Sequence, residues 1–136
     1  MNTDLIDIKI RAVEGGVTAA AGFKAAGIHA GFRKNPERLD YALVVPDKPC
    51  PGAGVFTTNR FCAAPVQVSR AHLGGADKGY GIIAGVSINS GNANAATGET
   101  GLACARETCN IASQVIGCEP QQILVASTGV IGQILP

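Results

Sequence analysis

The sequence predicts an α+β domain in which one long helix covers a face of a β-sheet. Three observations support this fold class: several short apolar stretches typical of strands, one long segment with helical periodicity, and an apolar strand directly after that segment. The 136 residues are enough for one domain with a modest core. Because no linker or internal repeat interrupts the chain, we expect residues 1–136 to form a single domain.

Strand-like segments precede the predicted helix. Each is a short apolar run or an apolar/polar alternation bounded by Gly, Pro or polar residues. These segments are residues 5–10, 39–47, 52–59, 64–73 and 81–89. Residues 15–33 are rich in Gly and Ala and keep neither the helical nor the strand period, so we expect strands interrupted by bends there.

One helix is predicted between Thr97 and Gly117. Thr97 is a suitable N-cap, Glu99 suits the positive end of the helix dipole, and Gly117 can adopt the left-handed conformation that ends a helix. Pro120 can start a single helical turn before the apolar strand at residues 123–126. The apolar stripe of this helix consists of Leu102, Ala105, Cys109, Ala112 and Ile116.

Charge and composition exclude several classes of partner. The net charge is +1 and only 4% of residues are aromatic, so no basic or base-stacking surface for nucleic acid is expected. No apolar run approaches the ~20 residues that a membrane helix needs. The N-terminus also lacks the basic start and apolar core of a signal peptide. We therefore expect a cytoplasmic protein that binds neither nucleic acid nor membranes.

The cysteines favour reduced thiols over a disulfide framework. Their number is odd and no CxxC spacing occurs, so buried or half-buried thiols are expected. No Cys and His residues have the spacing of a metal site, and we expect neither a metal nor a bound cofactor. A metal-binding cysteine protein is the weakest alternative. The cysteines are Cys50, Cys62, Cys104, Cys109 and Cys118.

Two polar stretches are candidates for a functional site. In "VASTGVIG", residues 125–132, a strand ends in Ser-Thr-Gly, where a hydroxyl and a Gly N–H could form an oxyanion hole for a tetrahedral acyl intermediate. Local chemistry alone favours a turn with a Ser/Thr hydrogen bond there. "NSGNANAATG", residues 89–98, could be a ligand cradle or a turn whose Asn side chains satisfy backbone groups, and local chemistry favours the turn.

Four longer blocks follow one another along the chain. They are "GGVTAAAGFKAAGIHAGF" (15–32), "AGVFTTNRFCAAPVQVSRAHL" (53–73), "NSGNANAATGETG" (89–101) and "VASTGVIGQILP" (125–136). Together they resemble the N-terminal part of the α chain in the bifunctional ornithine acetyltransferase family, also called glutamate N-acetyltransferase. Four blocks in the same order make this resemblance far more specific than any single motif.

The resemblance implies a self-processing enzyme of arginine biosynthesis, built as a layered αββα sandwich of the N-terminal-threonine acyltransferase type. In this family the precursor cuts itself ahead of an internal Thr, and the new N-terminal Thr moves acetyl from N-acetyl-L-ornithine to L-glutamate. Some members also accept acetyl-CoA, as a substrate and not as a bound cofactor. The oxyanion hole would come from the Thr128 hydroxyl and the Gly129 backbone N–H.

The resemblance covers only the N-terminal portion of a family member. The nucleophilic Thr would lie downstream, and no Thr of residues 1–136 is assigned that role. We expect a β chain with the N-terminal Thr as partner, an α2β2 heterotetramer, and no activity of this chain alone. The alternative is a small binding or structural module of the same fold without catalysis. Exposed apolar surface distinguishes the two, because a severed fragment would show it.

The Asn-rich stretch is expected to support the candidate oxyanion hole. Strands 81–88 and 123–126 could be neighbours, which would bring residues 89–94 beside Thr128. An amide can orient other groups but is a poor acid or base, so we expect a supporting role and no direct chemistry. The residues with this expected role are Asn89, Asn92, Asn94 and Ser127.

Overall fold

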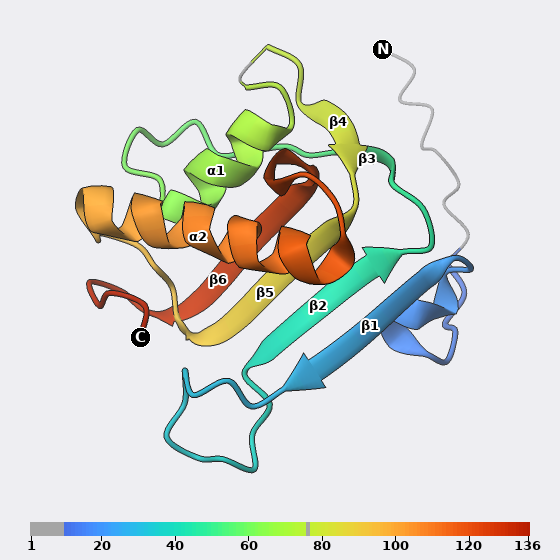
Figure 1. Cartoon of the computed structure of the whole chain (residues 1–136), viewed down its shortest axis with the longest axis horizontal. Helices are drawn as coiled ribbons and strands as arrows, with labels where there is room; N and C mark the ends of the chain where they lie inside the picture. Colours follow the sequence, from blue (N-terminus) through green and yellow to red (C-terminus); the bar gives the residue numbers. More distant parts are fainter. Residues whose placement is uncertain (1–9, 76) are drawn as a thin grey trace, which may run out of the picture.

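A mixed four-stranded sheet forms the centre of the computed structural model, which describes residues 10–75 and 77–136 (Figure 1). The strand order is β1-β2-β5-β6. Neighbouring strands are antiparallel except β5 and β6, which are parallel. The strands are β1 (Phe23–Ile28), β2 (Tyr41–Pro46), β5 (Gly85–Asn92) and β6 (Ile123–Val130).

Two helices lie on one face of this sheet, over β5 and β6 (Figure 1). They confirm the predicted α+β class. None of the helices in the described part of the chain is long and apolar enough to cross a membrane. The remaining elements are α1 (Ala64–His72), α2 (Gly98–Ile116), the strand pair β3 (Cys50–Ala53) and β4 (Tyr80–Ile83), and the 3-10 turns η1 (Gly16–Ala19) and η2 (Pro120–Gln122).

The parallel pair β5–β6 is joined by α2, the kind of crossover that parallel neighbours require. Gly85 pairs with Ile123 and Asn89 with Ser127, so the predicted neighbourhood of the two strands is confirmed. The strand predicted at 81–89 is divided by Ala84 into β4 and β5. β6 continues past its predicted end at residue 126, so Ser-Thr-Gly belongs to the strand.

The long helix α2 agrees with its prediction. Its buried stripe includes Ala105, Cys109 and Ala112. Gly117 ends it in the left-handed conformation, with φ of 81°, and its N–H donates to the Ser113 carbonyl. Thr97 occupies the N-cap position, but its hydroxyl donates to the side chain of Asn94 and makes no capping bond to the backbone.

The stretch 64–73, predicted as a strand, forms helix α1 up to His72. The buried residues Ala64, Pro65, Val68 and Ser69 lie on one helical face, whereas a strand would bury alternate positions. In the sequence Val66 and Val68 alternate with polar residues, which favours a strand, but packing against α2 and β6 overrides that pattern. Pro65 in the first helical turn is the helix signal that the prediction missed.

The other strand predictions had mixed outcomes. Residues 39–47 contain β2, which ends at Pro46 as expected. In residues 52–59 only the first two belong to β3, and the rest is irregular. Residues 15–33 contain η1 and β1, joined by a bend and turn. The strand predicted at 5–10 falls almost wholly on residues outside the described part of the chain.

The core lies between the two helices and β6. Cys109 is 1% exposed, and burial raises the pKa of its thiol to about 11. The other four cysteines are half-buried, as predicted. The buried cluster consists of Ala64, Val68, Ala105, Cys109, Ala112, Ile123 and Val125.

Two apolar surfaces of the sheet are left uncovered. On the helix side, a cavity of about 550 Å³ separates α2 from β1 and β2, with Leu43 and Ile111 among its lining residues. On the opposite face neither α1 nor α2 packs, although the strand alternation directs several apolar side chains there (Figure 1). These side chains belong to Ala25, Val44, Val86, Ile88, Leu124 and Ala126.

Candidate active site

Thr128 and Gly129 lie at the exposed end of β6, the edge strand of the sheet. The side chain of Thr128 alternates with that of Ser127 and therefore points to the face opposite the helices. No residue in the described part of the chain hydrogen-bonds to the Thr128 hydroxyl. The Ser/Thr-bonded turn favoured by local chemistry is thus absent from the described residues, and the hydroxyl is available to a ligand.

Gly129 has no room for a side chain. Its φ of 136° is a conformation that favours glycine. A β-carbon there would collide with the backbone of Gly91 and Asn92 on the neighbouring strand. The pairing of β5 with β6 is irregular at this point, where Asn92 is opposite both Thr128 and Val130. Close contact between two backbones therefore sets the position of Gly129.

Asn89 and Asn92 bind backbone groups around this contact. They are 6% and 4% exposed. The Asn89 amide donates to the Asn92 carbonyl at 2.8 Å. The Asn92 amide donates to the carbonyls of Gln133 and Ile134, at 3.2 and 3.0 Å. Together these bonds connect the end of β5 to the chain that follows β6.

Asn94 is fully buried and hydrogen-bonds to groups in the turn between β5 and α2. Its backbone is left-handed, with φ of 45°, and its N–H donates to the Asn92 side chain at 2.7 Å. Its amide donates to the Gly101 carbonyl and its side-chain oxygen accepts from the Thr97 hydroxyl, both at 2.8 Å. The Asn side chains are thus engaged with the protein itself, which favours a scaffold over a ligand cradle.

Ser127 lies opposite Asn89 in the strand register and is half-buried. Its side chain points to the helix side, away from that of Thr128. No hydrogen bond of its hydroxyl occurs in the described part of the chain. Its supporting role therefore stays a prediction.

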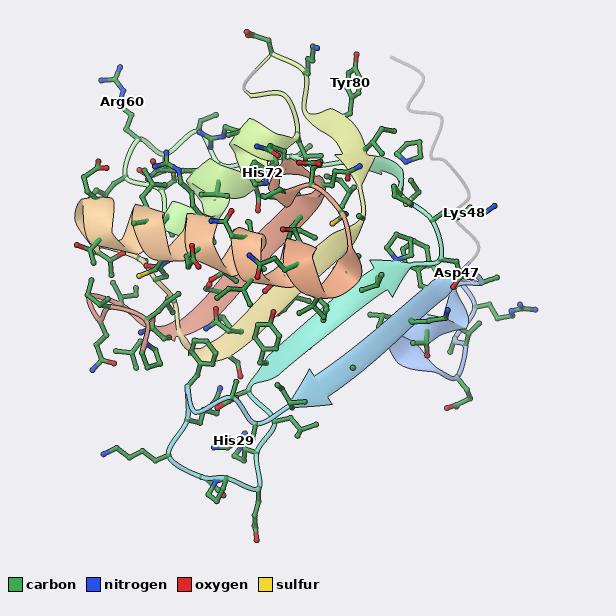
Figure 2. All side chains as sticks on the ribbon, viewed as in Figure 1. His29, Asp47, Lys48, Arg60, His72 and Tyr80 are labelled. Atoms are coloured by element: carbon green, nitrogen blue, oxygen red, sulfur yellow. The ribbon has the colours of Figure 1, made fainter. Side chains whose placement is uncertain are left out.

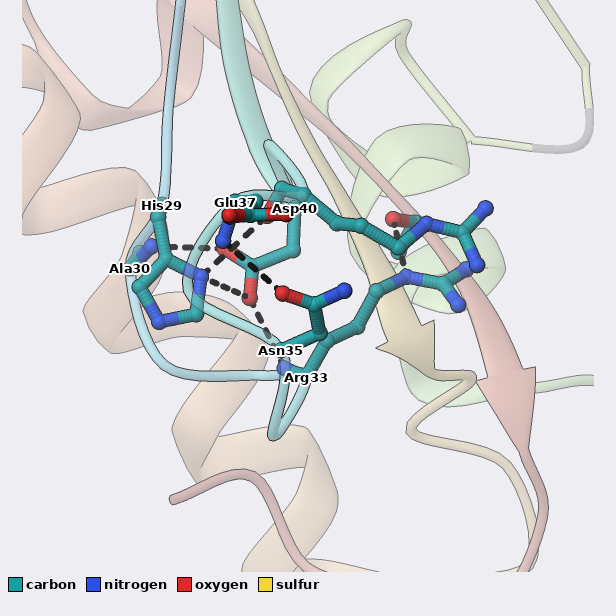
Figure 3. A network of polar contacts seen from close by, with 8 residues as sticks. His29, Ala30, Arg33, Asn35, Glu37 and Asp40 are labelled. Atoms are coloured by element: carbon teal, nitrogen blue, oxygen red, sulfur yellow. Dashed lines mark hydrogen bonds and ion pairs between the residues drawn. The ribbon is translucent and has the colours of Figure 1, made fainter.

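Asp40 is a buried acid that the sequence interpretation missed (Figure 3). It is 2% exposed, and its carboxylate accepts the N–H groups of Ala30 and Arg33 at 2.6 and 2.7 Å. His29 lies 3.2 Å from it. Burial alone raises the pKa of Asp40, but the backbone N–H donors and His29 outweigh burial and hold it below its usual value. Its signal in the sequence is an acid directly before the apolar run of β2.

The loop held by Asp40 contacts β5 where β5 contacts β6. The Asp40 carbonyl accepts the Ser90 N–H at 2.8 Å. The Arg33 Nε donates to the Ser90 hydroxyl at 3.1 Å, and Figure 3 shows the Arg33 side chain that makes this bond. A β-carbon on Gly91 would lie 2.9 Å from the Phe32 carbonyl oxygen. The loop, Gly91 and Gly129 therefore form one continuous stack of close contacts.

Comparison with known proteins identifies the family. The ArgJ family model matches residues 24–136. This chain belongs to the ArgJ family. The arginine biosynthesis bifunctional protein ArgJ of Dehalococcoides mccartyi is 44% identical over 124 residues, covering 90% of this chain and 29% of that protein. The chain thus spans about three tenths of the length of this curated relative. The resemblance noted in the four sequence blocks is confirmed.

Two solved ArgJ structures share the fold. The Bacillus halodurans ArgJ structure superposes with a TM-score of 0.80 at 36% identity, covering 90% of this chain and 61% of that chain. The ornithine acetyltransferase of Mycobacterium tuberculosis, crystallised with ornithine, has a TM-score of 0.75 at 38% identity, covering 89% of this chain and 63% of that chain. The predicted fold class of the N-terminal-threonine acyltransferases is thereby supported at the level of overall fold.

Within this ArgJ fold, the described residues Thr128 and Gly129 offer hydrogen-bond donors, and the histidines lie on other elements. Figure 2 shows His29 in the loop after β1 and His72 on α1, well separated from each other. The His72 Nδ1 is 2.7 Å from the Ile123 carbonyl oxygen. Within the described part of the chain no His, Cys, Asp and Glu residues gather as a metal site would require. A hydroxyl beside a glycine N–H can stabilise a developing oxyanion when both donors point at the same oxygen.

Proposed function

We propose that this chain supplies the oxyanion hole of an acetyltransferase that moves acetyl from N-acetyl-L-ornithine to L-glutamate in arginine biosynthesis. The observation that carries the proposal is the end of β6, where an exposed Thr128 hydroxyl stands next to Gly129, whose backbone is held by Gly91. Family membership supports the same assignment, because the relatives carry names of arginine biosynthesis enzymes. One relative was crystallised with ornithine.

The proposed reaction is a two-step acyl transfer. The hydroxyl of the partner's N-terminal Thr attacks the acetyl carbonyl carbon, and its proton passes to that Thr's own amine or a neighbouring group. The carbonyl oxygen becomes an oxyanion that accepts hydrogen bonds from the Thr128 hydroxyl and the Gly129 N–H. The C–N bond then breaks and the ornithine amine leaves with a proton. The glutamate amine attacks the acetyl-threonyl ester in the second step and restores the Thr hydroxyl.

The proposal requires a partner chain with the nucleophile. The described site has two donors and no activated hydroxyl, so it stabilises charge but cannot start the reaction by itself. The two uncovered apolar surfaces of the sheet support a partner that packs on them. We assign this place to a β chain carrying the N-terminal Thr, in an α2β2 heterotetramer of the cytoplasm, with acetyl-CoA as a further acetyl donor.

The test is an acetyl-transfer assay on this chain together with its downstream part. Isotopically labelled N-acetyl-L-ornithine and L-glutamate are supplied, and labelled N-acetyl-L-glutamate is measured by mass spectrometry. We expect Thr128→Ala to lower kcat by roughly 10²–10³-fold, the usual effect of losing one oxyanion-hole donor. Thr128→Ser should retain most of the rate because it keeps the hydroxyl.

Thr100→Ala is the matched control, since Thr100 is an exposed residue of α2. It should leave the rate unchanged. A Thr128→Ala enzyme with the parental kcat would contradict the assignment of the oxyanion hole. Failure of the parental enzyme to transfer acetyl would contradict the reaction itself, and transfer by the isolated chain would contradict the need for a partner.

A further inference from the structure

The side chain of Arg33 is held beside the end of β5. Asp40 accepts the Arg33 backbone N–H at 2.7 Å, which positions the residue at its backbone. The Arg33 Nε donates to the Ser90 hydroxyl at 3.1 Å, which positions the guanidinium group. Arg33 is half-buried, unlike its neighbour Lys34, which is exposed. A cation held at both ends in this way is pre-organised for a ligand.

Ser90, which holds the Arg33 side chain, lies on the strand next to the candidate oxyanion hole. Ser90 and Thr128 are register partners on the parallel strands β5 and β6. Both side chains point to the face of the sheet opposite the helices, since Asn89 and Ser127 occupy the helix side. Neighbouring strands are ~4.8 Å apart, so Ser90 is one strand away from Thr128, and the Arg33 guanidinium is one hydrogen bond beyond Ser90.

The charge of Arg33 is not neutralised by the residues around it. The ion pairs in the described part of the chain are Lys24–Asp47 and His29–Asp40. The Asp40 carboxylate is occupied by the N–H groups of the loop and by His29. With its Nε on Ser90, the two terminal nitrogens of the guanidinium have no carboxylate partner among the described residues. This arrangement suits an anionic group brought by a ligand.

We propose that Arg33 binds the α-carboxylate of the N-acetylated amino-acid substrate and that Ser90 positions it for this role. The inference rests on the proposed function and names the carboxylate-binding group of the same site. In such a substrate only the amide nitrogen and Cα separate the carboxylate carbon from the acetyl carbonyl carbon. A carbonyl oxygen at Thr128 and Gly129 therefore brings the carboxylate within reach of a group one strand away.

The test compares N-acetyl-L-ornithine with its α-carboxamide, which lacks the negative charge. Both are offered to this chain together with its downstream part, and kcat and KM are measured. The parental enzyme should prefer the carboxylate. Arg33→Gln should raise KM for the carboxylate about 10- to 100-fold, the range expected for loss of a hydrogen bond to a charged group. KM for the carboxamide should change little, so the preference disappears.

Two further variants separate this role from general effects of charge or folding. Lys34→Gln removes a neighbouring exposed cation and should keep the preference for the carboxylate. Ser90→Ala should weaken the preference partially, because the guanidinium loses its positioning contact. A preference for the carboxylate that persists in Arg33→Gln overturns the inference. The inference is also overturned if Arg33→Gln leaves KM for both ligands unchanged and only lowers the melting temperature of the assembled protein. Arg33 would then pair with the partner chain and not with the substrate.

Calorimetric binding of the two ligands separates failure of this inference from failure of the proposed function. If the parental protein binds the carboxylate more tightly than the carboxamide but transfers no acetyl, the reaction is wrong and the carboxylate site stands. If it transfers acetyl and Arg33→Gln discriminates as well as the parent, the reaction stands and the carboxylate site is wrong.

Discussion

Gly129 has no space for a β-carbon because the backbone of Gly91 occupies it. Gly91 is confined in turn by the Phe32 carbonyl oxygen on its other side. Three segments distant in sequence therefore meet through backbone atoms at the end of the parallel pair. This contact brings the candidate oxyanion hole, the Asn-rich turn and the loop held by Asp40 to one place.

Gly129→Ala should unfold the end of β6 or displace it from β5. Both its unusual φ and the collision with the neighbouring backbone oppose a β-carbon. Gly132→Ala is the matched control, since its φ is also positive, at 80°, but nothing lies within 4 Å of the added carbon. We expect the control to lose about 1–2 kcal/mol of stability, measured by urea unfolding, and Gly129→Ala to lose more. Equal losses would show that backbone conformation alone, and not the contact with Gly91, restricts this position.

Asn94→Ala should destabilise the fold by about 1–3 kcal/mol, because it leaves the Gly101 carbonyl and the Thr97 hydroxyl without their partners in a buried site. Asn110→Ala removes a more accessible amide that bonds to Glu107, and it should cost less than about 0.5 kcal/mol. Chemical denaturation of both variants measures the difference. The kcat of Asn94→Ala is corrected for the folded fraction and its loss is expressed as a free energy. This loss should be smaller than the loss in free energy of unfolding. The reverse order would give Asn94 a direct role in the reaction.

Asp40 should stabilise the fold at neutral pH and lose this effect in acid. Its pKa in the folded chain lies below the ordinary value of 3.8, so the unfolded chain binds its proton first. The stabilisation is fully present above pH 3.8 and disappears as pH falls through the lower, folded pKa. Melting temperatures of the parent and Asp40→Asn should therefore differ at pH 7 and converge in acid. Asp47→Asn, in the exposed pair with Lys24, is the control and should show little difference at any pH.

Cys109 should resist alkylation while the half-buried thiols react. Burial raises its pKa from 9.0 to about 11, so its thiolate is roughly 100-fold scarcer at pH 8 than that of an ordinary thiol. Iodoacetamide labelling followed by peptide mass spectrometry measures each site, with Cys62 as the internal comparison because it is more exposed. Labelling of Cys109 as fast as Cys62 in the folded protein would show that the core opens readily.

Local pattern was sufficient for the features that depend on neighbouring residues. The stripe of α2 and its glycine end are properties of helical periodicity, and they occur where the sequence predicts them. The strand β2 and its end at Pro46 were likewise predictable from the local sequence. The Ser-Thr-Gly and Asn-rich stretches were also visible as candidates, because their residue types are unusual at the end of a strand.

Packing decided the features in which distant residues compete with local preference. Residues 64–73 show the apolar/polar alternation of a strand, but burial of one face against α2 and β6 makes Ala64–His72 a helix. No local pattern marks Asp40 as a buried acid, because its partners, the N–H groups of Ala30 and Arg33, are brought to it only by the loop.

The sequence by itself determined the fold class, the long helix, the family and the identity of Thr128 and Gly129 as candidates. Only the tertiary structure brought Arg33 and Ser90 beside them, through the register of two parallel strands separated in sequence by a helix. The physical reason is that side-chain periodicity reports which face of an element is buried, whereas the pairing of distant strands depends on backbone hydrogen bonds and packing that no local pattern records.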